Sequence, residues 1–367
     1  MRQLVETAEK PKQVLLVGIR DQKMKIEESE SLKAELAGLA KTLGLEIVRE
    51  ETVRIRENHP RYGMGNGKAE ELAALAGEFA VDCIVFDREL SPSQQRNWER
   101  LTGLAAVDRQ ELIIQIFSSR ARTREAELQA SLAELAYSLP RLSHKYIDLS
   151  RQRGGRYGTK GSGETRLETD RRLVLERMKQ LEKELGEVRK RRSVQRKKRE
   201  KAAIPSCALV GYTNAGKSSL LNALTGADAF VEDKLFATLD PTSRRLDIGN
   251  GRPVILTDTV GFIRRLPHDL VDSFRSTLEE AVRADMLLHV LDASDREMDS
   301  YYKTTMAVLR DLGAEKAPMI IALNKIDRLG DEEREAILLR YPGSIAVSAK
   351  KGTGLDELKR RITNLGR

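Results

Sequence analysis

The sequence has few of the features expected of a secreted or membrane protein. It holds only two cysteines in 367 residues, Cys83 and Cys207, so we expect no disulfide framework and two reduced, buried thiols. The N-terminus lacks a basic-then-apolar signal segment, and no apolar run is long enough to span a bilayer. Aromatic residues make up 4% of the chain and charged residues 33%, which favours a soluble, cytoplasmic protein with much charged helical surface.

The positive charge is concentrated in one part of the chain. Residues 1–140 carry 20 Lys and Arg against 23 Asp and Glu, and residues 206–367 carry 23 against 24. Residues 141–205 carry 21 against 9, a net charge of +12, whereas the whole chain is +8. A local excess of this kind points to a polyanionic partner.

The N-terminal part alternates strand-like and helix-like segments. Apolar strands are expected at 14–18, 45–55 and 82–87, and a leucine-bearing helix at 31–43. Ser91-Pro92 forms a plausible cap and first turn of a further helix. These segments predict a small α/β domain with a mostly parallel sheet over residues 1–118.

The middle part predicts two long helices, and we place a helical hairpin at 119–203. Leu128 to Leu139 form one helical face, and Pro140 is expected to end that helix. A basic, glycine-rich loop follows at 151–163 and contains Tyr157. The second helix is expected from about Thr165 to Ala202, with apolar residues in an a/d pattern that packs on the first helix.

The C-terminal part, residues 204–367, has the element order of a nucleotide-binding domain. Strands are expected at 207–211, 244–249, 253–258, 286–292, 318–323 and 344–348, with a helix from Lys217. The expected fold class is α/β: a doubly wound P-loop G domain, with one antiparallel strand pair, preceded by the small α/β domain and the antiparallel hairpin.

A phosphate-binding loop follows the first strand of this domain. Gly211-Tyr-Thr-Asn-Ala-Gly216-Lys217-Ser218 matches G-x-x-x-x-G-K-S/T and opens a helix. The glycines permit close backbone approach, Lys217 supplies charge to the β- and γ-phosphates, and Ser218 offers a hydroxyl to Mg²⁺. The motif therefore predicts a nucleoside triphosphate with Mg²⁺ as its cofactor.

Two further motifs identify the base and the γ-phosphate sensor. Asp258-Thr-Val-Gly261 follows a strand, so Asp258 can reach Mg²⁺ through water and Gly261 can donate its N–H to the γ-phosphate. Asn324-Lys-Ile-Asp327 offers a carboxylate to the paired donors of guanine, and adenine would leave that carboxylate unpaired. Ser348-Ala-Lys350 is placed to offer a backbone N–H to the guanine oxygen.

The Mg²⁺-sensing threonine of switch I must lie between Lys217 and Asp258. Thr225, Thr238 and Thr242 are the candidates, and Thr225 is expected to belong to the first helix of the domain. The residues themselves leave Thr238 and Thr242 open.

The chain resembles HflX-type GTPases, which are related to the Obg group. The resemblance rests on Tyr62-Gly-Met-Gly-Asn-Gly-Lys68, Leu90-Ser-Pro-Ser-Gln-Gln-Arg-Asn97, Gly161-Ser-Gly-Glu-Thr-Arg-Leu-Glu-Thr-Asp-Arg-Arg172 and Phe236-Ala-Thr-Leu-Asp240, and covers nearly the full length. It implies that Thr238 is the Mg²⁺-contacting residue and that residues 236–240 form switch I. It also implies a partner, the large ribosomal subunit and its rRNA, and a role in ribosome splitting, rescue or subunit maturation.

The sequence analysis thus predicts a full set of site residues. Lys217, Thr238 and Gly261 are expected to be catalytic, and Ser218 and Thr238 to ligate the metal. The nucleotide-binding set is Gly211, Tyr212, Thr213, Asn214, Ala215, Gly216, Lys217, Ser218, Phe236, Ala237, Thr238, Leu239, Asp240, Asp258, Thr259, Val260, Gly261, Asn324, Lys325, Ile326, Asp327, Ser348, Ala349 and Lys350.

One position departs from many small GTPases. Where these place a glutamine that orients the attacking water, this chain has Phe262. Either hydrolysis is slow until a partner completes the site, which we favour, or Phe262 only packs the switch. Arg264 and Arg265 are alternatives as arginines supplied in cis, although surface arginines of a mobile switch are the simpler interpretation.

Two questions stay open at this level. Gly63 to Ala69 is one residue short of a phosphate-binding loop, so it is expected to contact RNA or a neighbouring domain, with a weak ATP site as the alternative. The function is either a GTP-driven switch on the ribosome with partner-stimulated hydrolysis, or an RNA-binding or remodelling factor whose nucleotide acts structurally. We expect a monomer away from the ribosome. Relatives often continue into a further C-terminal domain, whereas this sequence ends at Arg367.

Overall fold

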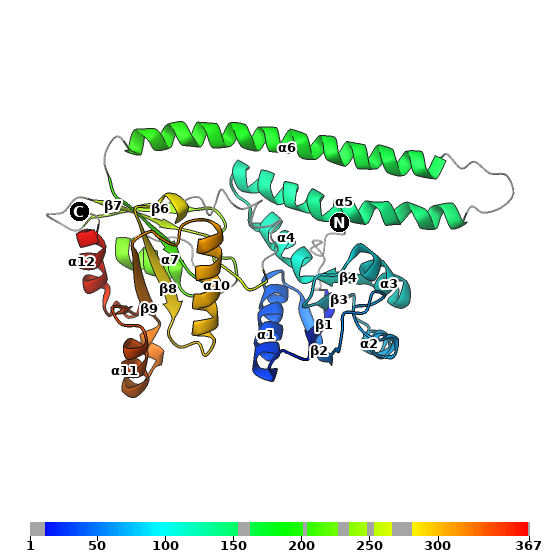
Figure 1. Ribbon diagram of the computed structural model, residues 1–367, viewed down its shortest axis with the longest axis horizontal. Helices are drawn as coiled ribbons and strands as arrows, with labels where there is room; N and C mark the ends of the chain where they lie inside the picture. Colours follow the sequence, from blue (N-terminus) through cyan, green and yellow to red (C-terminus); the bar gives the residue numbers. More distant parts are fainter. Residues whose placement is uncertain are drawn as a thin grey trace. The chain divides into compact units, whose positions relative to one another are not determined.

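The computed structural model divides the chain into two compact units (Figure 1). The first comprises residues 1–120 and 127–185, and the second comprises residues 121–126 and 186–367. The structure describes residues 12–152, 162–200, 204–226, 235–247, 253–265 and 281–365, without the side chains of residues 143–152, 162–167, 192–200 and 365. The chain passes from one unit to the other at three places: after residue 120, after residue 126 within α5 (Arg124–Gln152), and after residue 185 within α6 (Ser162–Glu200).

The first unit is built on a four-stranded parallel sheet. Its strand order is β2-β1-β3-β4, and every adjacent pair runs parallel, so the predicted small α/β fold is confirmed. Strands alternate with helices as parallel connections require. The elements are β1 (Gln13–Arg20), α1 (Ile26–Thr42), β2 (Glu46–Arg54), α2 (Asn66–Glu78), β3 (Cys83–Phe86), α3 (Pro92–Thr102), β4 (Ala105–Asp108) and α4 (Arg109–Arg120). Helices α2 and α4 and strand β4 were not predicted from the sequence.

Helix α3 begins as its sequence predicted. Ser91 is the N-cap, its hydroxyl accepts from the N–H of Gln94, the Gln94 side chain accepts from the N–H of Ser91, and Pro92 occupies the first turn. One face of α3 then holds the preceding loop, because Gln94 donates to the His59 carbonyl and Trp98 to the Tyr62 carbonyl. The segment 90–97 is therefore a structural element of the first unit.

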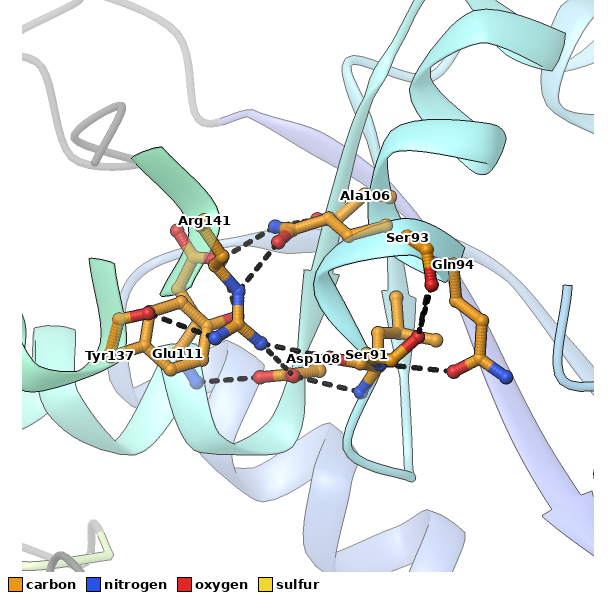
Figure 2. Close-up of polar contacts among 10 residues, drawn as sticks. Ser91, Ser93, Gln94, Ala106, Asp108, Glu111, Tyr137 and Arg141 are labelled. Atoms are coloured by element: carbon orange, nitrogen blue, oxygen red, sulfur yellow. Dashed lines mark hydrogen bonds and ion pairs between the residues drawn. The ribbon is translucent and has the colours of Figure 1, made fainter. Parts of the chain in front are cut away.

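A buried polar network anchors α5 to the sheet of the first unit (Figure 2). The Arg141 guanidinium donates to the Gln95 side chain and the Leu90 carbonyl, each at 2.8 Å, and lies 3.4 Å from the Asp108 carboxylate. The Tyr137 hydroxyl donates to Glu111 at 3.2 Å. Burial, reinforced by the Asp108 charge, raises the pKa of Glu111 to about 7, and burial also raises the pKa of Asp108. Gln95 thus ties the segment 90–97 to α5.

The expected end of this helix at Pro140 is wrong. Helix α5 continues from Arg124 to Gln152 with Pro140 inside it. A proline in a helix interior costs about 3 kcal/mol because it removes one hydrogen bond and crowds the preceding turn. The neighbours Tyr137 and Arg141 are both held by the buried network, so tertiary contacts fix the helix on either side of Pro140. Tertiary contacts here override local propensity.

Helix α6 keeps the expected a/d face. In the first unit α5 and α6 run in opposite directions (Figure 1), and Leu181 and Leu185 of the predicted seam are buried. The other seam residues, Val174, Met178 and Val188, are partly buried. Most of the predicted tip loop, including Tyr157, and the predicted helix end at 201–202 lie outside the described residues. No described helix is long and apolar enough to cross a membrane.

The second unit is a doubly wound α/β fold, as predicted. Its strand order is β10-β9-β8-β5-β7-β6, and the one antiparallel pair is β6 with β7. The elements are β5 (Ser206–Val210), α7 (Lys217–Thr225), β6 (Thr242–Leu246), β7 (Val254–Asp258), β8 (Met286–Asp292), α10 (Met298–Asp311), β9 (Met319–Asn324), the 3-10 turn Ile326–Arg328, α11 (Asp331–Arg340), β10 (Ile345–Ala346) and α12 (Leu355–Leu365). Cys207, like Cys83 in the first unit, is a buried free thiol.

Candidate nucleotide-binding site

The phosphate-binding loop joins the central strand β5 to α7. Gly211 has φ +148°, and a Cβ there would lie 2.3 Å from the backbone oxygen of Val290. Gly216 has φ +89°, and a Cβ there would lie 2.3 Å from the Asn324 side-chain nitrogen. Both positions therefore require glycine, for backbone conformation and for space. The loop ends at Gly216, the N-cap of α7, where a helix favours negative charge.

Lys217 begins α7 and is buried in the phosphate-binding loop. Its Nζ donates to the carbonyls of Gly211 at 3.1 Å and Tyr212 at 2.8 Å. Burial lowers the pKa of Lys217 to about 8, and the negative charge of Asp258 opposes that shift. A buried ammonium held among loop carbonyls is suited to neutralise a polyphosphate.

Three side chains form a set of oxygen ligands beside Lys217. The Asp258 Oδ2 accepts from Ser218 Oγ at 2.6 Å and from Thr238 Oγ1 at 2.9 Å, and the two hydroxyls lie 2.7 Å apart. The other oxygen, Asp258 Oδ1, is buried and accepts no hydrogen bond from the residues that the structure describes. Burial raises the pKa of Asp258. Hard oxygen donors converging in this way fit Mg²⁺, which binds few protein groups and completes its shell with water and phosphate.

The structure distinguishes the switch I threonines left open by the residues. Thr225 belongs to α7, and Thr242 begins β6 and donates to the Asp240 carbonyl at 3.4 Å. Only Thr238 of these three hydroxyls touches Asp258 and Ser218 in the described structure.

Switch II is docked on the phosphate-binding loop by its backbone. Phe262 donates its N–H to the Gly211 carbonyl at 3.1 Å, and its carbonyl accepts from Thr213 at 2.8 Å. Its side chain is buried, 1% exposed. Gly261 lies so close that a Cβ would sit 2.9 Å from Lys217 Nζ. Phe262 therefore packs the switch and cannot orient a water molecule.

The side chain of Arg264 contacts Glu297 and Tyr301. It forms an ion pair with Glu297 at 3.5 Å and lies over the ring of Tyr301 at 5.3 Å. Its backbone N–H donates to the hydroxyl of Tyr212 at 2.8 Å, and Tyr212 stacks on Tyr301. In this arrangement Arg264 holds switch II against Glu297, Tyr301 and Tyr212 and is not among the described residues that line the pocket.

The base-reading end is held together by side-chain hydrogen bonds. Asn324 donates to the Ala215 carbonyl at 3.0 Å and accepts from the N–H of Ala349 at 3.1 Å, so it connects the loops that contain these two residues. Ser348 donates to Asp327 at 2.6 Å, and this bond is the main cause of the lowered pKa of Asp327. Lys325 donates to the Asn214 carbonyl and pairs with Asp292. Asp327 is thus kept ionised and oriented.

These groups surround one pocket of about 520 Å³. The predicted residues that line it are Thr213, Asn214, Gly216, Lys217, Ser218, Phe236, Ala237, Thr238, Thr259, Gly261, Asn324, Lys325, Asp327, Ala349 and Lys350. The remaining predicted residues do not line the pocket. Among them, Asp258 accepts from Ser218 and Thr238, Ser348 donates to Asp327, and the carboxylate of Asp240 binds the segment before α5. Four lining residues were not predicted from the sequence: Ser219, Asn222, Ala223 and Arg328. Ser219 and Arg328 directly follow the two motifs, and Asn222 and Ala223 lie one helical turn further along α7, so their proximity to the motifs was the available signal.

The glycine-rich loop of the first unit is built differently. Lys68 pairs with Glu71 on the exposed side of α2. A Cβ at Gly65 or Gly67 would meet nothing within 4 Å, so neither glycine is required by packing. None of the loop's residues lines the pocket at Lys217.

A doubly wound sheet, a phosphate-binding loop, a switch threonine beside a buried aspartate and a guanine-reading aspartate define a P-loop GTPase. Family models agree along the chain: residues 30–118 match the GTP-binding GTPase N-terminal model, 120–199 the GTP-binding GTPase Middle Region and 206–325 the 50S ribosome-binding GTPase model. The chain belongs to the GTPase HflX family.

Several relatives match over most of their length. The GTPase HflX of Akkermansia muciniphila is 46% identical over 370 residues, covering 97% of this chain and 85% of that protein. The proteins of Caldanaerobacter subterraneus subsp. tengcongensis and Escherichia coli are 49% and 43% identical, covering 91% and 90% of this chain and 77% and 78% of theirs. A GTP-binding protein of Sulfolobus solfataricus, solved with GDP, is 25% identical, with 97% and 98% coverage and a TM-score of 0.51. The chain is therefore a GTPase that hydrolyses GTP to GDP and phosphate.

Proposed function

We propose that this GTPase binds the large ribosomal subunit and its rRNA, and that the bound subunit stimulates its hydrolysis of GTP. The observation that carries the proposal is Phe262, which is buried and backbone-paired where a water-orienting side chain is needed. Among the described residues that line the pocket there is no glutamine or histidine. A pocket that holds GTP without orienting its water needs a partner to complete it.

The nature of the partner is supported by charge and by relatedness. The net +12 of residues 141–205 favours a polyanion such as rRNA, and the G domain matches a family model described as a 50S ribosome-binding GTPase. On the described part of α6, Arg171, Arg172 and Arg177 are exposed. We assign the hairpin, residues 119–203, to RNA contact and residues 204–367 to nucleotide binding.

In the proposed mechanism the chain's own groups position the triphosphate. Lys217 binds the β- and γ-phosphates, and Asp327 accepts the two guanine donors. Ser218 and Thr238 would hold Mg²⁺, with Asp258 behind them; the bound ion neutralises developing charge on the phosphate oxygens. Gly261 moves its N–H to the γ-phosphate when switch II leaves the phosphate-binding loop. Loss of that phosphate releases both switches and ends the tight-binding state.

The decisive experiment compares GTP hydrolysis with large subunits, with small subunits and alone. We expect large subunits to raise kcat/KM by roughly tenfold or more, a barrier change of at least 1.4 kcal/mol, and small subunits to have no effect. Subunit binding should be tighter with a nonhydrolysable GTP analogue than with GDP. No stimulation together with equal binding in both states would refute the switch and favour an RNA-binding factor with a structural nucleotide. With intact ribosomes, light scattering would test whether the GTP state splits them.

The salt dependence of subunit binding tests the contact surface. Replacing the tip arginines Arg151, Arg153 and Arg156 with glutamine should lower the slope of log K against log salt by about two to three. The matched control replaces three exposed arginines outside the hairpin, Arg54, Arg56 and Arg361, and should leave the slope unchanged. Equal slopes for both triple variants would remove the hairpin tip from the interface.

A further inference from the structure

The switch I segment is attached at two residues, Thr238 and Asp240, to two different parts of the second unit. Thr238 touches Asp258 and Ser218 in the nucleotide pocket. Two residues further on, the Asp240 carboxylate accepts from the backbone N–H groups of Arg122 and Thr123 at 3.3 and 3.2 Å. Leu239 between them is buried, 3% exposed, so the two attachments are not independent of each other.

The second attachment lies at the beginning of α5. Thr123 directly precedes this helix, its hydroxyl donates to Asp240, and its oxygen accepts from the N–H of Ala126 at 3.2 Å. The first N–H groups of a helix have no partner within the helix, and a carboxylate there is favoured by the helix dipole. Asp240 therefore completes the cap of α5 through Thr123. The motif Phe236 to Asp240 thus carries two contacts, and only its first three residues line the pocket.

We propose that Asp240 is a positioning residue that couples the magnesium-side hydroxyl of Thr238 to the first turn of α5. When Thr238 is held in the GTP state, Asp240 is presented to residues 122–123 and the start of α5 is fixed. When Thr238 is released, the cap is lost and the first turn of α5 loosens. Because α5 is the first helix of the hairpin, the Asp240 carboxylate would make the conformation of the proposed RNA-binding element depend on the bound nucleotide. Linkage requires the reverse effect as well: fixing α5 favours the GTP state.

Hydrogen exchange of the amides at 122–126 measures the coupling directly. In the wild-type protein, with Mg²⁺, we expect these amides to exchange about tenfold more slowly with a nonhydrolysable GTP analogue than with GDP. Asp240→Ala should abolish the difference, whereas Asp247→Asn, which removes an exposed charge from the same unit, should keep it. Equal exchange in the two nucleotide states of the wild type, or a difference that survives Asp240→Ala, would overturn the proposal.

The partner side provides a rescue pair. Thr123→Val removes the hydroxyl while keeping the shape, and Thr123→Ser restores it. We expect Val to remove the nucleotide-dependent exchange and to lower kcat for GTP about fivefold with little change in KM, and Ser to behave as wild type. Asp240→Ala combined with Thr123→Val should be no slower than Asp240→Ala alone, because the hydroxyl–carboxylate bond that Thr123→Val removes is already lost in Asp240→Ala. Additive losses would show that the two residues act separately and would refute the coupling.

The inference rests on the proposed role of Thr238, but its test does not depend on the ribosome. All measurements use the isolated chain with nucleotide and Mg²⁺. If large subunits fail to stimulate hydrolysis while the exchange difference depends on Asp240, the partner assignment is wrong and the coupling stands. If subunits stimulate hydrolysis but exchange at 122–126 ignores the nucleotide, the coupling alone fails.

Discussion

Each of the two units places a glycine-rich loop and a lysine at the start of a helix, and of these two loops the one at 211–218 lines the described nucleotide pocket. The loop at 211–218 leaves the central strand β5 directly and enters α7 with Lys217. The loop at 62–68 begins well after β2 has ended, and α2 starts within it, at Asn66. In the first loop the glycines face packed atoms, whereas Gly65 and Gly67 face open space.

This difference indicates that close packing around the loop backbone, more than the number of glycines, distinguishes a phosphate-binding loop. At 211–218 the backbone packs closely against β8 and Asn324, and the side chain of Lys217 is buried. At 62–68 the loop is held from one side by α3, and Lys68 is exposed and paired within its own helix. The second arrangement supplies no enclosed charge, so we expect the loop of the first unit to contact a partner rather than ATP.

Substituting one glycine in each loop should break the comparison most strongly. Gly211→Ala places a Cβ on the Val290 carbonyl, and we expect it to cost about 3 kcal/mol of stability and to abolish nucleotide binding. Gly67→Ala lies in α2 with open space around it and should stabilise the first unit by about 0.5–1 kcal/mol. Thermal unfolding and nucleotide titration check both. Equal effects would show that crowding does not distinguish the loops.

Removing each lysine is the next test. Lys217→Ala should lower kcat/KM for GTP about 100-fold or more, because a charge placed on the transferring phosphate is lost. Lys68→Ala removes only an exposed ion pair with Glu71, worth at most about 1 kcal/mol, and should leave GTP hydrolysis unchanged. ATP binding by the Lys217→Ala variant that disappears on adding Lys68→Ala would contradict our interpretation of the first unit.

The sequence predicted the fold class and much of the pocket because both depend on local patterns. Strand β5, the loop at 211–218 and the start of α7 follow from apolar runs and glycine spacing. The continuation of α5 through Pro140 did not follow, since it depends on Arg141 reaching Gln95 and Leu90 in the folded unit. For the same reason Asp240, expected at the nucleotide, turned out to bind residues 122–123, which are distant in sequence. Contacts between remote segments leave no periodic signal.

The carboxylate at the base-reading end offers a third, smaller contrast, because the described part of the first unit has no counterpart to Asp327. Asp327→Asn should reduce the preference for GTP over ATP by roughly tenfold, the cost of mismatched buried hydrogen-bonding groups. Competition between GTP and ATP for a fluorescent guanine nucleotide measures that ratio. Asp331→Asn, at the exposed start of α11, is the control and should leave it unchanged. An unchanged ratio for Asp327→Asn would refute the assignment of guanine recognition.

The smallest expected effect concerns the protonation of Lys217. Burial lowers the pKa of Lys217 to about 8 from its usual 10.5, so between these values the unfolded chain binds a proton that the folded, nucleotide-free chain does not. Stability without nucleotide should therefore rise with pH across this window, and the destabilisation is fully present below pH 8. Nucleotide phosphates favour the ammonium, so binding above pH 8 must take up a proton.

Affinity for GDP should consequently fall as pH rises, by about fourfold between pH 7 and pH 8.5. Titration calorimetry in two buffers of different ionisation enthalpy should show proton uptake that grows over the same range. The Lys68→Ala variant should show the same pH dependence as wild type, because Lys68 is exposed on α2. A flat profile with no proton uptake would mean that Lys217 stays charged despite its burial, and that its carbonyl partners stabilise the ammonium more than burial opposes it.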